Sequence, residues 1–121
     1  MLRGIWPQSM KDERVYLAQM LDAVEKIREF VAGMDNAAFL KDRKTQSAVI
    51  LQLALIGEFA KRVSAPVRES TDIPWKEIAG FRDRAIHDYF QIDLQIAWDT
   101  ITLDLEPLTK AAQAYLDAHP W

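Results

Sequence analysis

Apolar residues recur along this chain at steps of three and four, and this spacing constrains the fold more than any other feature of the sequence. The clearest run comprises Leu17, Met20, Leu21, Val24, Ile27, Val31 and Met34. Residues at these steps share one face of an α-helix, so the run predicts an amphipathic helix over residues 11–31 that stops near Gly33. No stretch alternates between apolar and polar residues as a half-buried strand would. We therefore expect an all-α protein.

Three further long helices are predicted. Residues 42–63 are apolar around most of the helix circumference, which indicates the central and most buried helix. The stretch before it, residues 34–40, predicts a short turn or helical piece, and the polar stretch after it, residues 64–72, predicts the main loop.

The third helix begins around Asp72 or Ile73, has Pro74 in its first turn and continues to about Tyr89. Asp93 is a predicted cap for a fourth helix over residues 94–106, and Pro107 starts or kinks a last helix. The expected architecture is an up-and-down four-helix bundle with a kinked or split C-terminal helix.

The chain has 121 residues, which fits a single domain with its own core. Residues 10–121 are expected to form this helical domain. Residues 1–9 carry no helical pattern, and we interpret them as a flexible leader or as the result of a mis-assigned start. The absence of Cys excludes disulfides and thiolate chemistry and fits a cytoplasmic location. The longest apolar run, residues 48–57, is too short to span a bilayer, so no membrane contact is expected.

The net charge of −3 is unevenly distributed. Residues 41–68 contain six basic and two acidic residues, whereas residues 88–121 contain six acidic residues and one Lys. A locally basic surface on an acidic protein can meet RNA. Solvated helix faces explain the same pattern, and charge alone leaves both interpretations open.

The stretch FRDRAIHDYFQID, residues 81–93, concentrates side chains that could do chemistry. On an ideal helix Tyr89 lies within about 20° of Arg82, but His87 lies about 140° away. The three residues therefore do not converge on one face of one straight helix. Either the helix ends near His87, or a second copy of the chain completes the site across a two-fold axis. Asp83 lies one turn before His87 and could orient its imidazole.

An Arg and a His without a metal cluster suit the transesterification of RNA. The ribose 2′-OH supplies the nucleophile, His87 could transfer the proton near neutral pH, and Arg82 could stabilise charge on the phosphate. No metal or other cofactor is expected. The spacing also fits structural roles, namely a salt bridge for Arg82 and a helix-end His87 that caps carbonyl groups.

Several other residues have two interpretations. Glu58 is expected to be a partly buried carboxylate paired with Lys or Arg, with support of the site as the alternative. His119 is expected to be exposed and without a role. Four aromatic residues are interpreted as packing or dimer contacts rather than as platforms for bases: Trp75, Phe81, Phe90 and Trp98.

The stretch RDRAIHDYFQID resembles the signature of HEPN-domain proteins of the HepT-like toxin group, which reads Arg, four residues, His, one residue, Tyr. Further blocks, such as FLKDRKTQSAVILQLALIGEFAKRVS and DLQIAWDTITLDLEPL, resemble the family in the same order, so the resemblance covers residues 10–116. It implies a homodimeric all-α bundle that acts as a metal-independent endoribonuclease, the toxin of a toxin–antitoxin pair. It also implies that Arg82 and His87 are catalytic and that Asp83 supports them.

The resemblance further implies a partner, an MntA-like minimal nucleotidyltransferase antitoxin that modifies Tyr89 with AMP. Such an AMPylation would place phosphate and bulk beside the cleft and block RNA there. The alternative is a non-catalytic helical dimer that docks a nucleotidyltransferase or binds RNA or a nucleotide. A purely structural dimer is a second alternative. Whether the RNA substrate is messenger or transfer RNA stays open.

Overall fold

The computed structural model describes residues 12–121, and this part of the chain consists of helices and their connections, without a strand. The elements are α1 (Glu13–Val31), α2 (Asn36–Lys41), α3 (Arg43–Arg62), α4 (Ala65–Ser70), α5 (Trp75–His87), η3 (Tyr89–Gln91), α6 (Leu94–Leu103) and α7 (Leu105–Ala118). The all-α prediction is confirmed. The predicted leader, residues 1–9, lies outside the described residues.

Aspartates begin four of the helices because their carboxylates accept N–H groups that the first turn leaves unpaired. Asp12, Asp35 and Asp42 cap α1, α2 and α3, with distances to the accepted N–H nitrogens of 2.9, 2.8 and 3.0 Å. Asp93 caps α6 as predicted, accepting from the N–H groups of Gln95 and Ile96. After α1, Gly33 adopts φ +79°, a conformation that favours glycine and stops the helix.

Three of the predicted boundaries are wrong. The third helix begins at Trp75 and has Pro74 at its cap, so Pro74 precedes the first turn and is not part of it. Residues 64–72 are not simply a loop, because they contain α4, in which Pro66 occupies the first turn and Val67 is buried. The third helix ends at His87 rather than at Tyr89, since α5 is closed by Asp88 and Tyr89 begins the separate turn η3.

The last helix is split, as predicted, but the break comes at Asp104, before Pro107. Pro107 has no N–H to donate to the carbonyl of Leu103, and its ring would collide with that carbonyl in a continuous helix. Therefore α6 stops at Leu103, and Pro107 sits in the first turn of α7.

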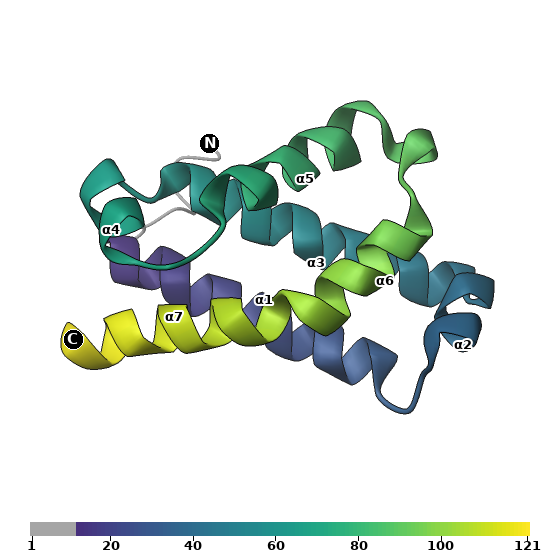
Figure 1. The fold of residues 1–121 in the computed structure, drawn as a ribbon, viewed down its shortest axis with the longest axis horizontal. Coiled ribbons are helices and arrows are strands. Elements are labelled where there is room, and N and C mark those ends of the chain that lie inside the picture. Colours follow the sequence, from purple (N-terminus) through teal and green to yellow (C-terminus); the bar gives the residue numbers. More distant parts are fainter. Residues whose placement is uncertain (1–11) are drawn as a thin grey trace, which may run out of the picture.

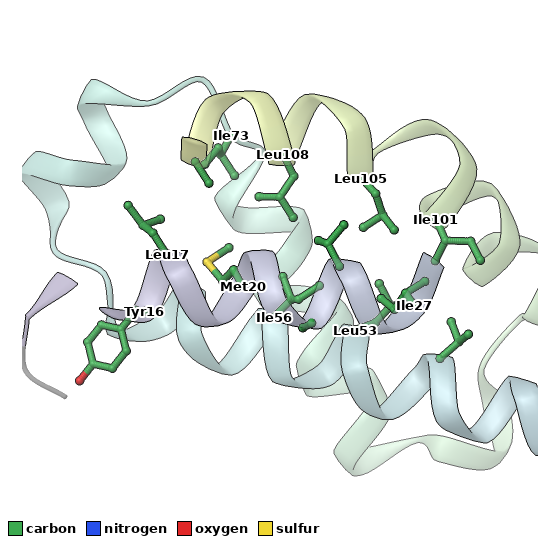
Figure 2. Close-up of a cluster of buried hydrophobic side chains, with 14 of the residues drawn as sticks. Tyr16, Leu17, Met20, Ile27, Leu53, Ile56, Ile73, Ile101, Leu105 and Leu108 are labelled. Atoms are coloured by element: carbon green, nitrogen blue, oxygen red, sulfur yellow. The ribbon is translucent and has the colours of Figure 1, made fainter. Parts of the chain in front are cut away.

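The core forms where α1, α3 and the α6–α7 pair meet (Figure 1). Figure 2 shows the contributing side chains, with Leu17, Met20 and Ile27 from α1, Leu53 and Ile56 from α3, and Ile101, Leu105 and Leu108 from the split helix. Helix α3 is central, with its main contacts to α5 and α1. Within residues 12–121 we find no helix with the length and apolar character that a membrane crossing requires.

Gly57 lets α3 and α5 pack closely. A Cβ atom at Gly57 would lie 2.8 Å from the carbonyl oxygen of Ile78 and would overlap the Cβ atom of Arg82. Only a residue without a side chain fits there without a shift of α5. The helix that carries Arg82 is therefore seated directly against α3.

We predict that Gly57→Ala lowers the free energy of unfolding by about 1–3 kcal/mol, because the added methyl group overpacks the α3–α5 contact. Gly80→Ala is the matched control. It lies within α5 with open space around the position of its Cβ, so it should stabilise the protein by about 0.5–1 kcal/mol. Urea unfolding followed by circular dichroism measures both. A neutral Gly57→Ala would show that α5 adjusts freely.

Candidate functional site

The C-terminal end of α5 carries the residues that the sequence singled out. Arg82 is half-buried on the side of α5 that faces α3, while His87, the last residue of the helix, is exposed. The N–H group of Asp88 bonds to the carbonyl of Arg84 at 2.8 Å and closes the helix, and Tyr89 follows in η3. The helix thus ends at His87, which was one of the two geometries considered.

Arg82 lies within a chain of alternating charges that links α3 and α5. Its Nε atom lies 2.9 Å from Glu58 Oε2, and its Nη1 atom lies 3.2 Å from Asp83 Oδ1. Glu58 also pairs with Arg62 at 3.2 Å, and Asp83 pairs with Lys61. The predicted pairing of Glu58 with a basic residue is confirmed. The carboxylates of Glu58 and Asp83 therefore hold the guanidinium of Arg82. Together with Lys61 and Arg62, this cluster contains three cations and two carboxylates, so its net charge is positive.

Asp83 faces this chain of charges. The hydrogen bond from Lys61, with a further one from Arg82, lowers the pKa of the Asp83 carboxyl below its ordinary value. The carboxylate stays ionised at neutral pH and helps to hold Arg82. Within residues 12–121 no hydrogen bond or ion pair joins Asp83 to His87, or His87 to any other side chain. The contact through which Asp83 could orient the imidazole of His87 is thus absent from residues 12–121 of the single chain.

Tyr89 lies beside the first half of α3. Its hydroxyl oxygen is 3.1 Å from Ser47 Oγ, within hydrogen-bond distance, and its side chain is 43% exposed. Its ring meets Phe90 edge to face with ring centroids 5.6 Å apart. The Tyr89 side chain is therefore at the surface, and the hydroxyl of Ser47 is the one hydrogen-bond partner of its hydroxyl among the described residues.

These contacts show that α3 and α5 run antiparallel, with Ser47 opposite Tyr89 at one end and Glu58 opposite Arg82 at the other. Between the two ends lie three large apolar side chains that are partly exposed: Leu51, Leu55 and Ile86, at 57%, 36% and 53%. We call the surface formed by Ser47, Leu51, Leu55, Glu58, Arg82, Ile86 and Tyr89 the α3–α5 face. An apolar strip of this kind between polar ends is typical of a protein–protein contact.

Sequence reasoning missed three residues of this region: Ser47, Gly57 and Lys61. Each of them contacts a residue of α5 or η3 that lies more than twenty positions away along the chain. Only the register between the two helices reveals these partners, so no local pattern could have identified them.

The other side of α5 has a different character. A hollow of about 460 Å³ lies between α5 and the α6–α7 pair, with Leu53, Ile56 and Phe81 among its lining residues. Lys76, Glu77, Arg84 and Asp104 give it charges of both signs, but neither His87 nor Tyr89 lines it. The hollow is thus separate from the candidate chemistry.

Other residues that could do chemistry stand apart. His119 is exposed, as expected, and it stacks on Tyr115 at the far end of α7 with ring centroids 4.0 Å apart. In the described part of the chain, no three His, Cys, Asp or Glu side chains gather in a way that could hold a metal ion. Three of the aromatic residues, Trp75, Phe81 and Trp98, pack against the core as expected, whereas Phe90 does not.

Comparison with known proteins shows what this chain is similar to. The family model described as "Ribonuclease HepT-like" matches residues 20–115. "Putative RNase TTE0752" of Caldanaerobacter subterraneus subsp. tengcongensis is 38% identical over 108 residues, which cover 88% of this chain and 96% of that protein. "Probable ribonuclease HepT" of Thermococcus cleftensis is 37% identical over 99 residues, which cover 81% of this chain and 90% of that protein. No solved structure matches the chain.

The charge chain leads to a prediction about Asp83. Since its pKa is lowered in the folded state, the stabilisation from its ion pairs is complete above its ordinary pKa and is lost as the pH falls through the lowered value. Lys61→Met removes the larger cause and should raise the pKa of Asp83 toward the ordinary value. An NMR titration of the Asp83 carboxyl carbon measures both proteins. An unchanged pKa in the variant would mean that Lys61 does not hold this carboxylate.

Proposed function

Because this chain belongs to the HepT-like ribonuclease family, we propose that it is an endoribonuclease that cleaves RNA without a metal ion. The observation that carries the proposal is that one helix holds both a fixed Arg82 and, at its end, an exposed His87. Phosphate binding needs a cation held in place, and proton transfer needs a group that can reach the ribose.

In the proposed reaction the 2′-oxygen of the ribose attacks the adjacent phosphorus, and the bond from phosphorus to the 5′-oxygen breaks. His87 accepts the 2′-hydroxyl proton, and the imidazolium so formed returns a proton to the leaving 5′-oxygen. The products are a 2′,3′-cyclic phosphate, or its hydrolysis product, and a 5′-hydroxyl. Arg82 stabilises the charge on the phosphate, and its Nη2 group, which has no hydrogen bond to another described residue, can donate to a phosphate oxygen.

We also propose that two copies of the chain pair through the apolar middle of the α3–α5 face, and that its two polar ends stay accessible. Leu51, Leu55 and Ile86 form an exposed apolar strip there, and covering them would remove apolar surface from water. A two-fold axis through this face would bring two copies of the motif together. Arg82 and His87, which point in different directions on one α5, would then meet across the dimer cleft.

Control by a partner completes the proposal. The chain would be the toxin of a toxin–antitoxin pair, and an MntA-like minimal nucleotidyltransferase would transfer AMP to the hydroxyl of Tyr89. That hydroxyl attacks the α-phosphorus of ATP and loses its proton, while pyrophosphate leaves. Its exposure and its single contact with Ser47 support access to such an enzyme. The added phosphate would lie on the α3–α5 face and compete with RNA.

A second candidate is a non-catalytic dimer that docks the nucleotidyltransferase or holds RNA or a nucleotide. The observation in its favour is that His87 lacks a partner within residues 12–121 that would orient its imidazole. The two candidates differ in whether His87 is needed for RNA cleavage.

We predict that the chain, expressed without a partner, cleaves RNA in the presence of EDTA. His87→Ala should lower the rate by about 10²–10⁴-fold, the usual contribution of a general acid or base. His119→Ala is the matched control and should leave the rate unchanged, since His119 lies at the far end of α7. Gel analysis of cleaved RNA measures the rates, and mass spectrometry confirms that Tyr89 is unmodified.

Sedimentation of the same samples should show a dimer. Cleavage by a monomer would contradict the paired cleft. Equal inactivity of wild type and His87→Ala, with both folded and dimeric, would support the docking module instead. Equal activity of these two proteins would remove His87 from the mechanism.

We predict that co-expression with an MntA-like nucleotidyltransferase adds AMP to Tyr89 and abolishes cleavage. Tyr89→Phe should resist both effects, because it lacks the hydroxyl that accepts AMP. Ser47→Ala is the matched control, since it removes the same hydroxyl contact but keeps the acceptor, and it should still be modified. Peptide mass spectrometry measures the modification. AMP at another residue, or inhibition of Tyr89→Phe, would contradict the assignment.

A further inference from the structure

Phe90 occupies an unusual position for a large aromatic residue. It is 95% exposed, more than any other large hydrophobic residue of the described chain, and its only ring contact there is the edge-to-face one with Tyr89. The turn η3 holds it there, because the N–H groups of Gln91 and Ile92 bond back to the carbonyls of Asp88 and Tyr89. An exposed aromatic ring presents a flat apolar surface to any partner that stacks.

Three basic side chains lie at the start of α3 or just before it. Lys41 ends α2, and Arg43 and Lys44 begin α3; all three are exposed, and none forms an ion pair within residues 12–121. Arg43 and Lys44 lie one helical turn before Ser47, whose hydroxyl meets that of Tyr89. Arg43 and Lys44 are therefore neighbours of the Tyr89–Phe90 pair, and Lys41 lies two residues before Arg43 in the chain.

The acidic residues nearby do not neutralise this surface. Both carboxylate oxygens of Asp42 accept hydrogen bonds from Thr45, one from its N–H at 3.0 Å and one from its hydroxyl at 2.9 Å. These hydrogen bonds lower the pKa of Asp42, so it remains an ionised helix cap. Asp88 is exposed beside Tyr89 and is the second negative group. Asp93, which follows η3, caps α6, and within residues 12–121 none of these three carboxylates forms an ion pair with Lys41, Arg43 or Lys44.

We infer that Lys41, Arg43, Lys44 and Phe90 form a basic–aromatic surface that binds single-stranded RNA next to the scissile phosphate. Phe90 stacks on an unpaired base, and the three cations contact phosphates of adjoining nucleotides. Stacking platforms beside cationic tracks bind single strands with little sequence preference, because every base has a flat face. The inference rests on the proposed function and deepens it, since it makes unpaired RNA the substrate class and places the flanking strand over the start of α3.

Binding to an RNA that cannot be cleaved tests this surface separately from catalysis. The probe is a fluorescent single-stranded 2′-O-methyl RNA, which lacks the attacking hydroxyl, and anisotropy measures its affinity for the full chain at several salt concentrations. Lys41→Gln, Arg43→Gln and Lys44→Gln together should lower the affinity and reduce the slope of log affinity against log salt by about 2, or about 0.7 for each lost phosphate contact.

The matched control removes three cations from other parts of the molecule: Lys26→Gln in α1, Lys76→Gln at the start of α5 and Lys110→Gln in α7. It has the same net charge and should keep the slope nearly unchanged. Equal losses of RNA affinity in the two triple variants would mean that only the net charge of the protein matters, and this result would overturn the inference. Failure of the wild-type protein to bind the probe would also overturn the inference. The same holds if the variant without Lys41, Arg43 and Lys44 keeps its RNA affinity but fails to bind a nucleotidyltransferase.

Phe90 variants test the stacking. Phe90→Leu keeps an apolar side chain for any contact between copies but loses the aromatic face, and it should lower the affinity by about 5- to 150-fold, the range for one stacked base. Phe90→Trp should retain the affinity. Equal affinity of Phe90→Leu and wild type would overturn the stacking, and sedimentation confirms that both remain in the same assembly. If the natural RNA is not cleaved but the probe binds as described, the nuclease proposal fails while this inference stands.

Discussion

The close contact between α3 and α5 at Gly57 is the constraint on which the rest of the site depends. The absence of a side chain there allows the Cβ atom of Arg82 to sit against the backbone of α3. Once this point is fixed, the antiparallel course of the helices sets every other pairing. Glu58 reaches Arg82 at one end, and Ser47 reaches Tyr89 at the other. A methyl group at position 57 would therefore disturb charges and hydroxyl contacts that it never touches.

The same packing explains why one surface can serve several purposes. Helix α3 has more apolar residues than its contacts with α1 and α5 can cover, so Leu51 and Leu55 remain at the surface. The charged residues of the α3–α5 face lie toward one end of this strip, and the hydroxyl pair lies at the other. Dimer contact, phosphate binding and modification of Tyr89 would thus share one face. Such sharing gives a partner that binds or modifies one end a direct effect on the rest.

Much of the fold follows from the sequence because its determinants are local. Apolar spacing predicts α1 and α3, Asp93 predicts the start of α6, and the proline at position 107 predicts the split of the last helix. The errors arise where a long-range contact decides. Helix α4 forms because Val67 is buried and because Glu13, from the start of α1, accepts the N–H of Ser64 at 2.5 Å. A polar stretch that contains proline gives no sign of either contact.

The candidate site divides in the same way. The motif identifies Arg82, His87 and Tyr89 within one short stretch, and the helical repeat shows that they diverge. The motif does not predict which of these side chains is held in place by its neighbours and which is not. Arg82 is held by two carboxylates, while His87 stands at a helix end without a partner in the described chain. Under the proposed function, a fixed Arg82 would suit a phosphate whose position must not vary, and an exposed His87 would be able to turn toward the oxygen that carries the proton. The contact with α3 creates this difference, because Glu58 reaches Arg82 across the helix pair, whereas no described side chain of α3 reaches His87.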